Sequence, residues 1–257
     1  MQNDAIPELA RRLWQAGNGE PPVDPELAGW LDDLESAHAV EDATRALVVD
    51  AGERVIGYKI GLTSQPARDV FGAGEPAAGH LLASRLLPEG EDLAIAELFA
   101  PKAEVEIAFV LGEALPGPDV TAGDVRNATA EVAPAFEIVD SRWRGGPSTL
   151  PMLVADNTNA ARAVLGPRVG LPGGSLSEVV ATLSIGDREI PGSATAVMGD
   201  PAEAVAWLAR HLLNRGLRLE AGDIVLSGTL CPPTVISAGD RLVADLGELG
   251  RVALDVD

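Results

Sequence analysis

The sequence predicts an α+β fold in which a helical opening precedes a mixed, β-rich core. Apolar residues recur at helical spacing up to about residue 50, and short β-like runs broken by Gly and Pro begin at residue 54. These runs do not alternate strictly with helices, which argues against a doubly wound sheet. We therefore expect a helical segment over residues 1–52 and a β-rich domain over residues 53–257.

The opening segment is expected to hold two helices, over 5–17 and 25–50, separated by Pro21 and Pro22. Three later helices are expected over 64–71, 121–132 and 200–215, the first two after Ser64 and Thr121 as possible N-caps and the last before Gly216 at its C-cap. Strands are expected over 54–62, 102–112, 134–143, 179–186, 222–230 and 240–257.

Composition excludes several classes of function. Acidic residues outnumber basic ones by 39 to 19, so the formal net charge of −20 makes nucleic acid an unexpected partner. No apolar run approaches the ~20 residues that span a bilayer, and the first residues carry no secretory signal. The single cysteine, Cys231, allows no intrachain disulfide. We therefore expect a soluble cytoplasmic protein without a membrane partner.

Two carboxylates lie within an apolar run. On a strand, residues i and i+2 share a face, so Glu104 and Glu106 of KAEVEIAFVLG (102–112) project together. Glu at this spacing is often a solvated strand edge, but both faces here are otherwise apolar. Buried like charges are unfavourable unless they are protonated or held on a cation. Glu137 lies in a similar apolar run. Three carboxylates without histidine or thiolate suit Mg²⁺ or Mn²⁺, so they are candidate metal ligands.

Five sequence blocks resemble the 2-keto-4-pentenoate hydratase family of the fumarylacetoacetate hydrolase superfamily. They are GYKIGLTS (57–64), PKAEVEIAFVLG (101–112), PAFEIVDSRW (134–143), VADNTNAARAVLG (154–166) and AGDIVLSGTL (221–230). The family includes 2-oxohept-3-enedioate hydratases and 4-oxalocrotonate decarboxylases. The resemblance implies a mixed β-sandwich roll with an N-terminal helical part, metal ligation by Glu104, Glu106 and Glu137, and a homo-oligomer.

The resemblance also implies roles for other residues. Lys59 matches an active-site lysine that moves protons or binds the substrate carboxylate. Candidate substrate-binding residues are Arg142, Asp156, Ser227 and Thr229. Arg142 is equally suited to a structural pair with Asp140, and Asp156 to holding a turn.

The sequence departs from the family in the loop after the helix at 64–71. Many family hydratases carry Pro-Asp-aromatic-Gly there, and this chain has Ala77 where the acid is expected and Ala78 where the ring is expected. That acid is thought to position the water or a proton. His38, Glu75 and His80 are candidates to supply the missing group.

The leading interpretation is a Mg²⁺-dependent lyase that hydrates a 2-hydroxy-2,4-dienoate to a 4-hydroxy-2-oxo acid. Decarboxylation of a 2-oxo-3-enedioate proceeds through the same kind of dienolate, so the metal ligands do not separate the two. An acylpyruvate C–C hydrolase is a further alternative, with His38 and Glu41 as a loose His–Glu pair. A non-catalytic partner in a complex with a related decarboxylase or hydratase is the alternative outside enzymes.

Overall fold

The computed structural model describes residues 2–115 and 117–257, with side chains from residue 5 onward. The opening segment forms α1 (Gln2–Ala16) and α2 (Leu34–Asp50). The expectation of one helix over 25–50 is wrong. A short 3₁₀ turn (Pro25–Ala28) is followed by a break, because the Asp33 carboxylate accepts the amide N–H of Ser36 and caps a new helix.

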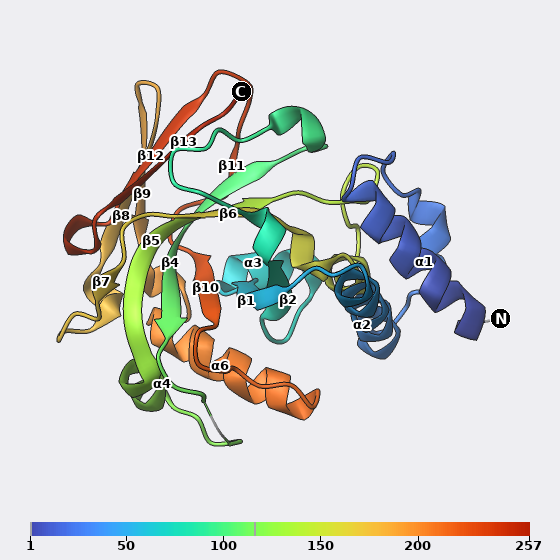
Figure 1. The fold of residues 1–257 in the computed structure, drawn as a ribbon, viewed down its shortest axis with the longest axis horizontal. Helices are drawn as coiled ribbons and strands as arrows, with labels where there is room; N and C mark the ends of the chain where they lie inside the picture. Colours follow the sequence, from blue (N-terminus) through green and yellow to red (C-terminus); the bar gives the residue numbers. More distant parts are fainter. Residues whose placement is uncertain (1, 116) are drawn as a thin grey trace.

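Two sheets form the rest of the chain (Figure 1). The main sheet runs in the order β2–β1–β10–β4–β5–β6–β3, with β11 paired to β4 and β7 paired to β5. Its strands are β1 (Val55–Gly61), β2 (Ala77–Leu82), β3 (Leu86–Leu87), β4 (Lys102–Leu111), β5 (Thr129–Val139), β6 (Ala160–Leu165), β7 (Val169–Gly170), β10 (Ile224–Thr229) and β11 (Thr234–Val235). The smaller sheet has the order β13–β12–β8–β9, from β8 (Val180–Ile185), β9 (Arg188–Ser193), β12 (Arg241–Asp245) and β13 (Arg251–Asp255).

Four further helices are α3 (Gln65–Phe71), α4 (Ala122–Ala128), α5 (Leu150–Ala155) and α6 (Pro201–Asn214). Ser64 and Thr121 cap α3 and α4 as expected, and Gly216 ends α6 with a φ of 72°. Helix α4 stops at residue 128 rather than 132, since β5 already begins at Thr129. The elements missed from the sequence are α5, β2, β6, β9 and the two-residue strands. No helix in the described part of the chain is long and apolar enough to cross a bilayer.

The two faces of β4 have different neighbours. Val105, Ile107 and Phe109 point into the main apolar core, which β12, β13 and α6 complete. The opposite face carries the acidic residues. A separate apolar cluster joins α1 and α2 to α5 and Trp143. Figure 1 shows α1 and α2 beside the β-rich part, close to the β1–β2 end of the main sheet. The fold is therefore the expected mixed β roll with a helical N-terminal part.

Candidate active site

The three acidic residues meet on one face of the main sheet. Glu104 of β4 and Glu137 of β5 are directly paired in the antiparallel register, and Glu106 lies two residues further along β4 on the same face. One carboxylate oxygen from each residue lies within 4.8 Å of the other two. Glu106 and Glu137 are fully buried, whereas Glu104 is partly buried. The strand register therefore builds a compact triad, which the Glu-x-Glu spacing alone could not show.

Burial and mutual repulsion disfavour charge on the triad. Burial raises the pKa of Glu104 to about 7, with Glu137 adding to the rise. Burial likewise raises the pKa of Glu106 and Glu137, and the two neighbouring carboxylates raise that of Glu106 further. Glu106 Oε1 and Glu137 Oε2 accept no hydrogen bond from any described residue, whereas Glu137 Oε1 lies 3.1 Å from the Lys59 ammonium. Buried carboxylate oxygens without donors, grouped this closely, are suited to bind a cation.

The donor set fits a hard divalent cation. It offers carboxylate oxygens alone, on a partly open site, and Glu106 Oε1 and Glu137 Oε2 among them are buried without a hydrogen-bond donor from the described residues. Glu104, Glu106 and Glu137 would hold such an ion. A metal bound there would chelate the carboxylate and 2-oxo group of a substrate and stabilise enolate charge.

Lys59 reaches the triad from β1. Its ammonium Nζ lies 3.1 Å from Glu137 Oε1 and donates to the backbone carbonyl of Thr158 at 3.1 Å. Burial acts to lower the pKa of Lys59, but the charges of Glu137, Glu104 and Glu106 outweigh it and the pKa is raised. Lys59 is therefore a buried ammonium directed at the carboxylates rather than a strand-edge lysine.

A bulge in β10 supplies one more contact to the triad. The β4–β10 register shifts between Leu226 and Thr229, which turns the amide N–H of Gly228 onto Glu106 Oε2 at 2.8 Å. Gly228 has a φ of 109°, and a Cβ there would lie 2.6 Å from the Thr63 side chain, so only glycine fits. Thr229 donates its hydroxyl to the Cys231 carbonyl, and the buried Ser227 hydroxyl has no partner among the described residues.

A cavity of about 1130 Å³ reaches the triad at Glu104. Lys59, Glu104 and Thr229 line it, so it brings together three of the sequence-predicted site residues. Its walls are largely apolar and come from α3, the β10–β11 turn and the loop after β5. The exposed cations Lys102 and Arg144 also line it. Neither forms an ion pair within 4.0 Å among the described residues.

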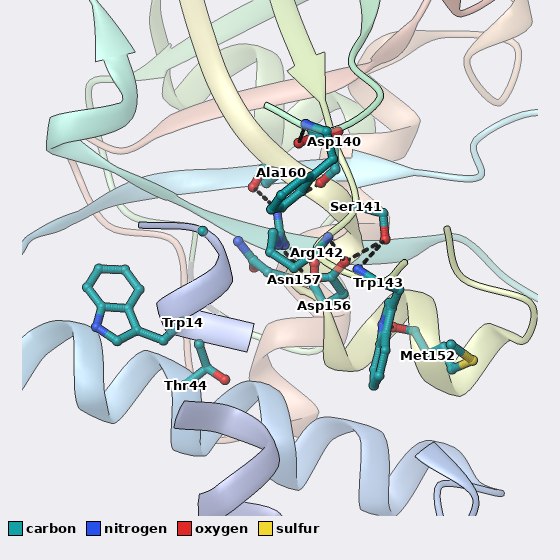
Figure 2. Close-up of polar contacts among 12 residues, drawn as sticks. Trp14, Thr44, Asp140, Ser141, Arg142, Trp143, Met152, Asp156, Asn157 and Ala160 are labelled. Carbon is teal, nitrogen blue, oxygen red and sulfur yellow. Dashed lines mark hydrogen bonds and ion pairs between the residues drawn. The ribbon is translucent and has the colours of Figure 1, made fainter. Parts of the chain in front are cut away.

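Arg142 and Asp156 form a buried ion pair instead of facing this cavity (Figure 2). Arg142 Nε donates to Asp156 Oδ1 at 2.5 Å, and the other guanidinium nitrogens donate to the carbonyls of Asp140, Asp156 and Ala160. Burial raises the pKa of Asp156 to about 6 against the pull of Arg142. The Ser141 hydroxyl also donates a hydrogen bond to Asp156 Oδ2 at 2.9 Å. These contacts assign both residues to holding the loop after β5 against α5.

Asp140 is not the partner of the Arg142 guanidinium. Its carboxylate accepts the backbone amides of Phe99 and Ala100, so only its main-chain carbonyl bonds Arg142.

His38, Glu75 and His80 lie in a second polar cluster that does not line the cavity. His38 Nδ1 is 3.3 Å and His80 Nδ1 is 3.7 Å from the buried carboxylate of Glu41, which also binds Arg215 at 2.7 Å. Burial alone would raise the pKa of Glu41, but these partners hold it well below its usual range. Glu75 accepts the indole N–H of Trp207 on α6 at 3.2 Å.

The strand register explains why His80 cannot reach Lys59. His80 is paired with Tyr58, so its side chain lies on the face of β1 and β2 opposite to Lys59. Ala77 is paired with Gly61 and shares the face of Lys59. An acid at position 77 would therefore lie on the face of the sheet that carries Lys59, although Ala77 itself packs in the apolar cluster of α1, α2 and α5 and does not line the cavity.

Two residues of the site were missed from the sequence. Thr158 presents its carbonyl to Lys59, and Gly61 makes room for Thr158, since a Cβ at position 61 would lie 2.8 Å from Thr158 Cγ2. Both residues lie within the family blocks at 57–64 and 154–166. Thr158 acts through its backbone carbonyl and Gly61 through the absence of a side chain, and the residue type reveals neither role.

Known proteins resemble this chain over most of its length. Residues 53–257 match the family model described as fumarylacetoacetate (FAA) hydrolase C-terminal. A 2-hydroxyhexa-2,4-dienoate hydratase of Comamonas testosteroni is 43% identical over 209 residues, which is 79% of each chain. A 2-keto-4-pentenoate hydratase of Paraburkholderia phymatum is 37% identical over 254 residues, with 97% of each chain covered.

The structural match covers the whole chain. The 4-oxalocrotonate decarboxylase from Pseudomonas putida G7, solved with magnesium and adipate, superposes with a TM-score of 0.95 at 26% identity, covering 100% of this chain and 99% of that one. With the acidic triad and its lysine in place, these matches show that the chain belongs to the fumarylacetoacetate hydrolase family.

Proposed function

We propose that this protein is a Mg²⁺-dependent hydro-lyase that adds water to a 2-hydroxy-2,4-dienoate and yields a 4-hydroxy-2-oxo acid. The observation that carries the proposal is the buried triad Glu104–Glu106–Glu137 with Lys59 Nζ 3.1 Å from Glu137, at the wall of a substrate-sized cavity. Two hydratases that match at 43% and 37% identity support the reaction class. Magnesium in the decarboxylase structure supports the choice of ion.

The reaction needs protons at two substrate carbons. Ketonisation of the dienol removes the proton from the C2 hydroxyl and adds one at C5, and this produces a double bond between C3 and C4 conjugated to the 2-oxo group. Water then adds its oxygen at C4, and C3 takes up a proton. Lys59 is the buried proton-bearing group of the site, and we assign it the proton transfer at C3.

The cavity walls also bear on the substrate tail. Val70 and Phe71 of α3 and Pro232 with Pro233 after β10 make an apolar passage, which suits an uncharged alkyl or alkenyl tail. Lys102 and Arg144 lie on the cavity lining and favour entry of the anionic acid into a chain whose net charge is −20.

The second candidate is decarboxylation of a 2-oxo-3-enedioate. Ala77 favours it, because the chain lacks the acid that many family hydratases carry at this position, and loss of CO₂ needs no water. The fold match to 4-oxalocrotonate decarboxylase is consistent with it. A C–C hydrolase is disfavoured, since the His38–Glu41 pair is saturated by His80 and Arg215 and does not line the cavity.

One experiment separates these reactions. The purified chain is incubated with Mg²⁺ and a panel of 2-hydroxydienoates and 2-oxo-enedioates, while absorbance loss is followed and products are identified by mass. A mass gain of one water on a dienoate supports the hydratase. Loss of CO₂ from an enedioate supports the decarboxylase. No turnover of any member with Mg²⁺ contradicts both and favours a non-catalytic partner of a related enzyme.

We also propose that the protein is a homo-oligomer that works in the cytoplasm. Val70, Val180 and Val235 are the most exposed large apolar side chains of the described residues, at 76%, 69% and 67%, and burying them against a second copy would be favourable. Light scattering coupled to size exclusion measures the mass of the particle, and a monomer would contradict this part of the proposal.

A further inference from the structure

Three consecutive residues of the loop after α5 are left-handed although none is glycine. Asn157, Thr158 and Asn159 have φ values of 50°, 49° and 60°. Asparagine tolerates this conformation, but a β-branched threonine there is a genuine outlier. Strained backbone of this kind persists only where the surroundings hold it, and it gathers at functional sites. We call Asn157–Asn159 the left-handed turn.

Side-chain hydrogen bonds fasten the left-handed turn to β2. The Asn157 amide accepts the backbone N–H of His80 at 2.7 Å and donates to the His80 carbonyl at 3.0 Å. The Thr158 hydroxyl donates to the carbonyl of Ala78 at 2.6 Å. Strand β2 ends the path of the main sheet, so the turn pairs with its free edge as another strand would.

Two glycines, one in β1 and one in β2, allow the left-handed turn to pack closely against these strands. A Cβ on Gly79 would lie 2.4 Å from the Asn157 carbonyl oxygen, and a Cβ on Gly61 would lie 2.8 Å from Thr158 Cγ2. Neither glycine has a φ in the left-handed region, so conformation does not explain them. Both positions are glycine because the turn occupies the space of a side chain.

The left-handed turn contributes one group to the site, the backbone carbonyl of Thr158. Thr158 is buried, its carbonyl accepts from Lys59 Nζ at 3.1 Å, and the other anchor of that ammonium is Glu137. An ammonium has three donors, so two are fixed and one remains for the cavity that Lys59 lines. The two anchors come from different elements, β5 and the loop after α5.

We propose that the left-handed turn is the device that positions Lys59, with Thr158 as a positioning residue that acts through its backbone carbonyl and Gly61 as the gap that lets it approach. This inference rests on the proposed proton-transfer role of Lys59. It adds that the strained turn sets where the ammonium lies, so that displacing the turn impairs turnover without loss of the metal site.

A steric compensation experiment tests the inference. Gly61→Ala places a methyl against Thr158 Cγ2 and should push the turn away from Lys59. Thr158→Ser keeps the hydroxyl that bonds Ala78 but removes Cγ2, so the double variant Gly61→Ala with Thr158→Ser should fit again. Thr129→Val is the matched control, since Thr129 is also a buried threonine whose hydroxyl bonds a carbonyl, at the far end of β5. For each variant kcat, KM, Mg²⁺ affinity by calorimetry and thermal stability are measured.

We expect Gly61→Ala to lower kcat at least about tenfold while KM and Mg²⁺ affinity change less than about threefold, because a misplaced group impairs the chemical step more than binding. The Thr129→Val control should stay within about threefold of the parent, Thr158→Ser should lose less kcat than Gly61→Ala, and the double variant should return to the level of Thr158→Ser. In a Lys59→Met background the Gly61→Ala effect should fall below about twofold, as expected for two changes acting through one group.

Other outcomes overturn the inference. They are an unchanged kcat in Gly61→Ala, no recovery in the double variant, or an equal loss in the Lys59→Met background. If Gly61→Ala does not fold, Thr158→Val, which removes the bond to Ala78, is measured in both backgrounds with the same expectation. A loss below about threefold in Lys59→Met alone would instead refute the proposed role of Lys59. If Lys59→Met lowers kcat strongly while the variants of the left-handed turn leave kcat unchanged, the positioning role of the turn is refuted and the role of Lys59 stands.

Discussion

Glu104 and Glu137 face each other as direct partners across β4 and β5, with Glu106 beside them on the same face. Like charges at directly opposed positions destabilise a sheet, and here burial removes the screening by water. The arrangement is therefore unfavourable in the apo protein and becomes favourable once a cation binds. A cation held there, as proposed, would contribute to both activity and stability.

The first prediction concerns a triad ligand. Glu106→Gln should lower Mg²⁺-dependent turnover at least about 10²-fold, about 3 kcal/mol of transition-state stabilisation, because a carboxylate ligand is lost. The melting temperature without metal should stay equal or rise, since one of three like charges is removed. Turnover and melting with EDTA or Mg²⁺ measure both effects. Glu113→Gln, exposed just beyond β4, is the control and should change neither. Full activity with unchanged Mg²⁺ affinity in Glu106→Gln would remove the metal site from the proposal.

The second prediction concerns the buried ammonium. Lys59→Met should lower kcat at least about 10²-fold, as loss of an acid–base group does, with Mg²⁺ affinity retained. Lys102→Met is the matched control, because Lys102 lines the same cavity but is exposed and binds no carboxylate. It should raise KM and leave kcat within about threefold, since an exposed cation acts mainly on encounter. Steady-state kinetics on the dienoate separate the two, and equal effects on kcat would contradict the distinction.

The sequence could predict the chemistry of the site but not its geometry. Glu104, Glu106 and Glu137 follow from carboxylates in apolar runs, and Lys59 from a cation in another. The spacing of residues along the chain does not reveal how the strands pair. A register shifted by one residue would place His80 beside Lys59. The register also places His80 on the face opposite to Lys59, and packing places His38 beside Glu41 and Glu75 beside Trp207, so none of the three expected substitutes for the missing acid reaches Lys59.

Elements with weak periodicity were also missed. Strand β2 has the sequence AAGHLL, in which two alanines and a glycine give no alternation, yet all six residues are buried. Gly79 in this strand leaves room for the left-handed turn. The packing of that turn, rather than strand propensity, therefore determines the residue at this position. The break before α2 was hidden because Leu27, Trp30, Leu31 and Leu34 keep helical spacing across it. The Asp33 cap was the available signal.

The third prediction concerns acid stability and the cluster around Glu41. Burial lowers the pKa of His211, which stacks on Trp207 with ring centroids 4.8 Å apart. A lowered histidine pKa means that folding favours the neutral ring, so its stabilising effect is complete above about pH 6.5, the unfolded value, and is lost as pH falls through the folded pKa. His211→Phe should therefore lose less melting temperature than the parent between pH 7.5 and 5.5. Equal losses, with Mg²⁺ saturating throughout, would contradict this.

The fourth prediction concerns Arg144 at the cavity. Arg144→Gln should lower kcat/KM severalfold through KM and weaken its dependence on ionic strength, because the cation offsets repulsion between an anionic substrate and a chain of charge −20. Arg188→Gln, an exposed arginine of β9 away from the cavity, is the control. Rates measured from about 20 to 300 mM salt test the point, since screening lengths shorten over this range. If kcat/KM changes with salt concentration to the same extent in the parent and in Arg144→Gln, Arg144 does not steer the substrate toward the cavity.

The last prediction concerns Ala77, where the chain departs from its relatives. Position 77 shares the face of Lys59, whereas Ala78 and His80 point to the opposite face. The metal ligands and Lys59 are intact, so enolisation should persist. We therefore expect Mg²⁺-dependent exchange of the C3 protons of 2-oxopentanoate with deuterium.

The later step, water addition at C4, lacks a carboxylate at position 77, and none of His38, Glu75 or His80 lines the cavity. Hydration of 2-hydroxypenta-2,4-dienoate should accordingly be slow. Ala77→Asp should raise hydration about tenfold or more, toward the lower range for an added acid–base group, and change exchange less than about threefold. Ala77→Asn controls for side-chain size and should raise neither rate. Exchange is followed by NMR and dienoate loss by absorbance. If the parent hydrates the dienoate briskly and Ala77→Asp alters neither rate, water at C4 is activated by another group of the cavity, and the loop acid has no part in this enzyme.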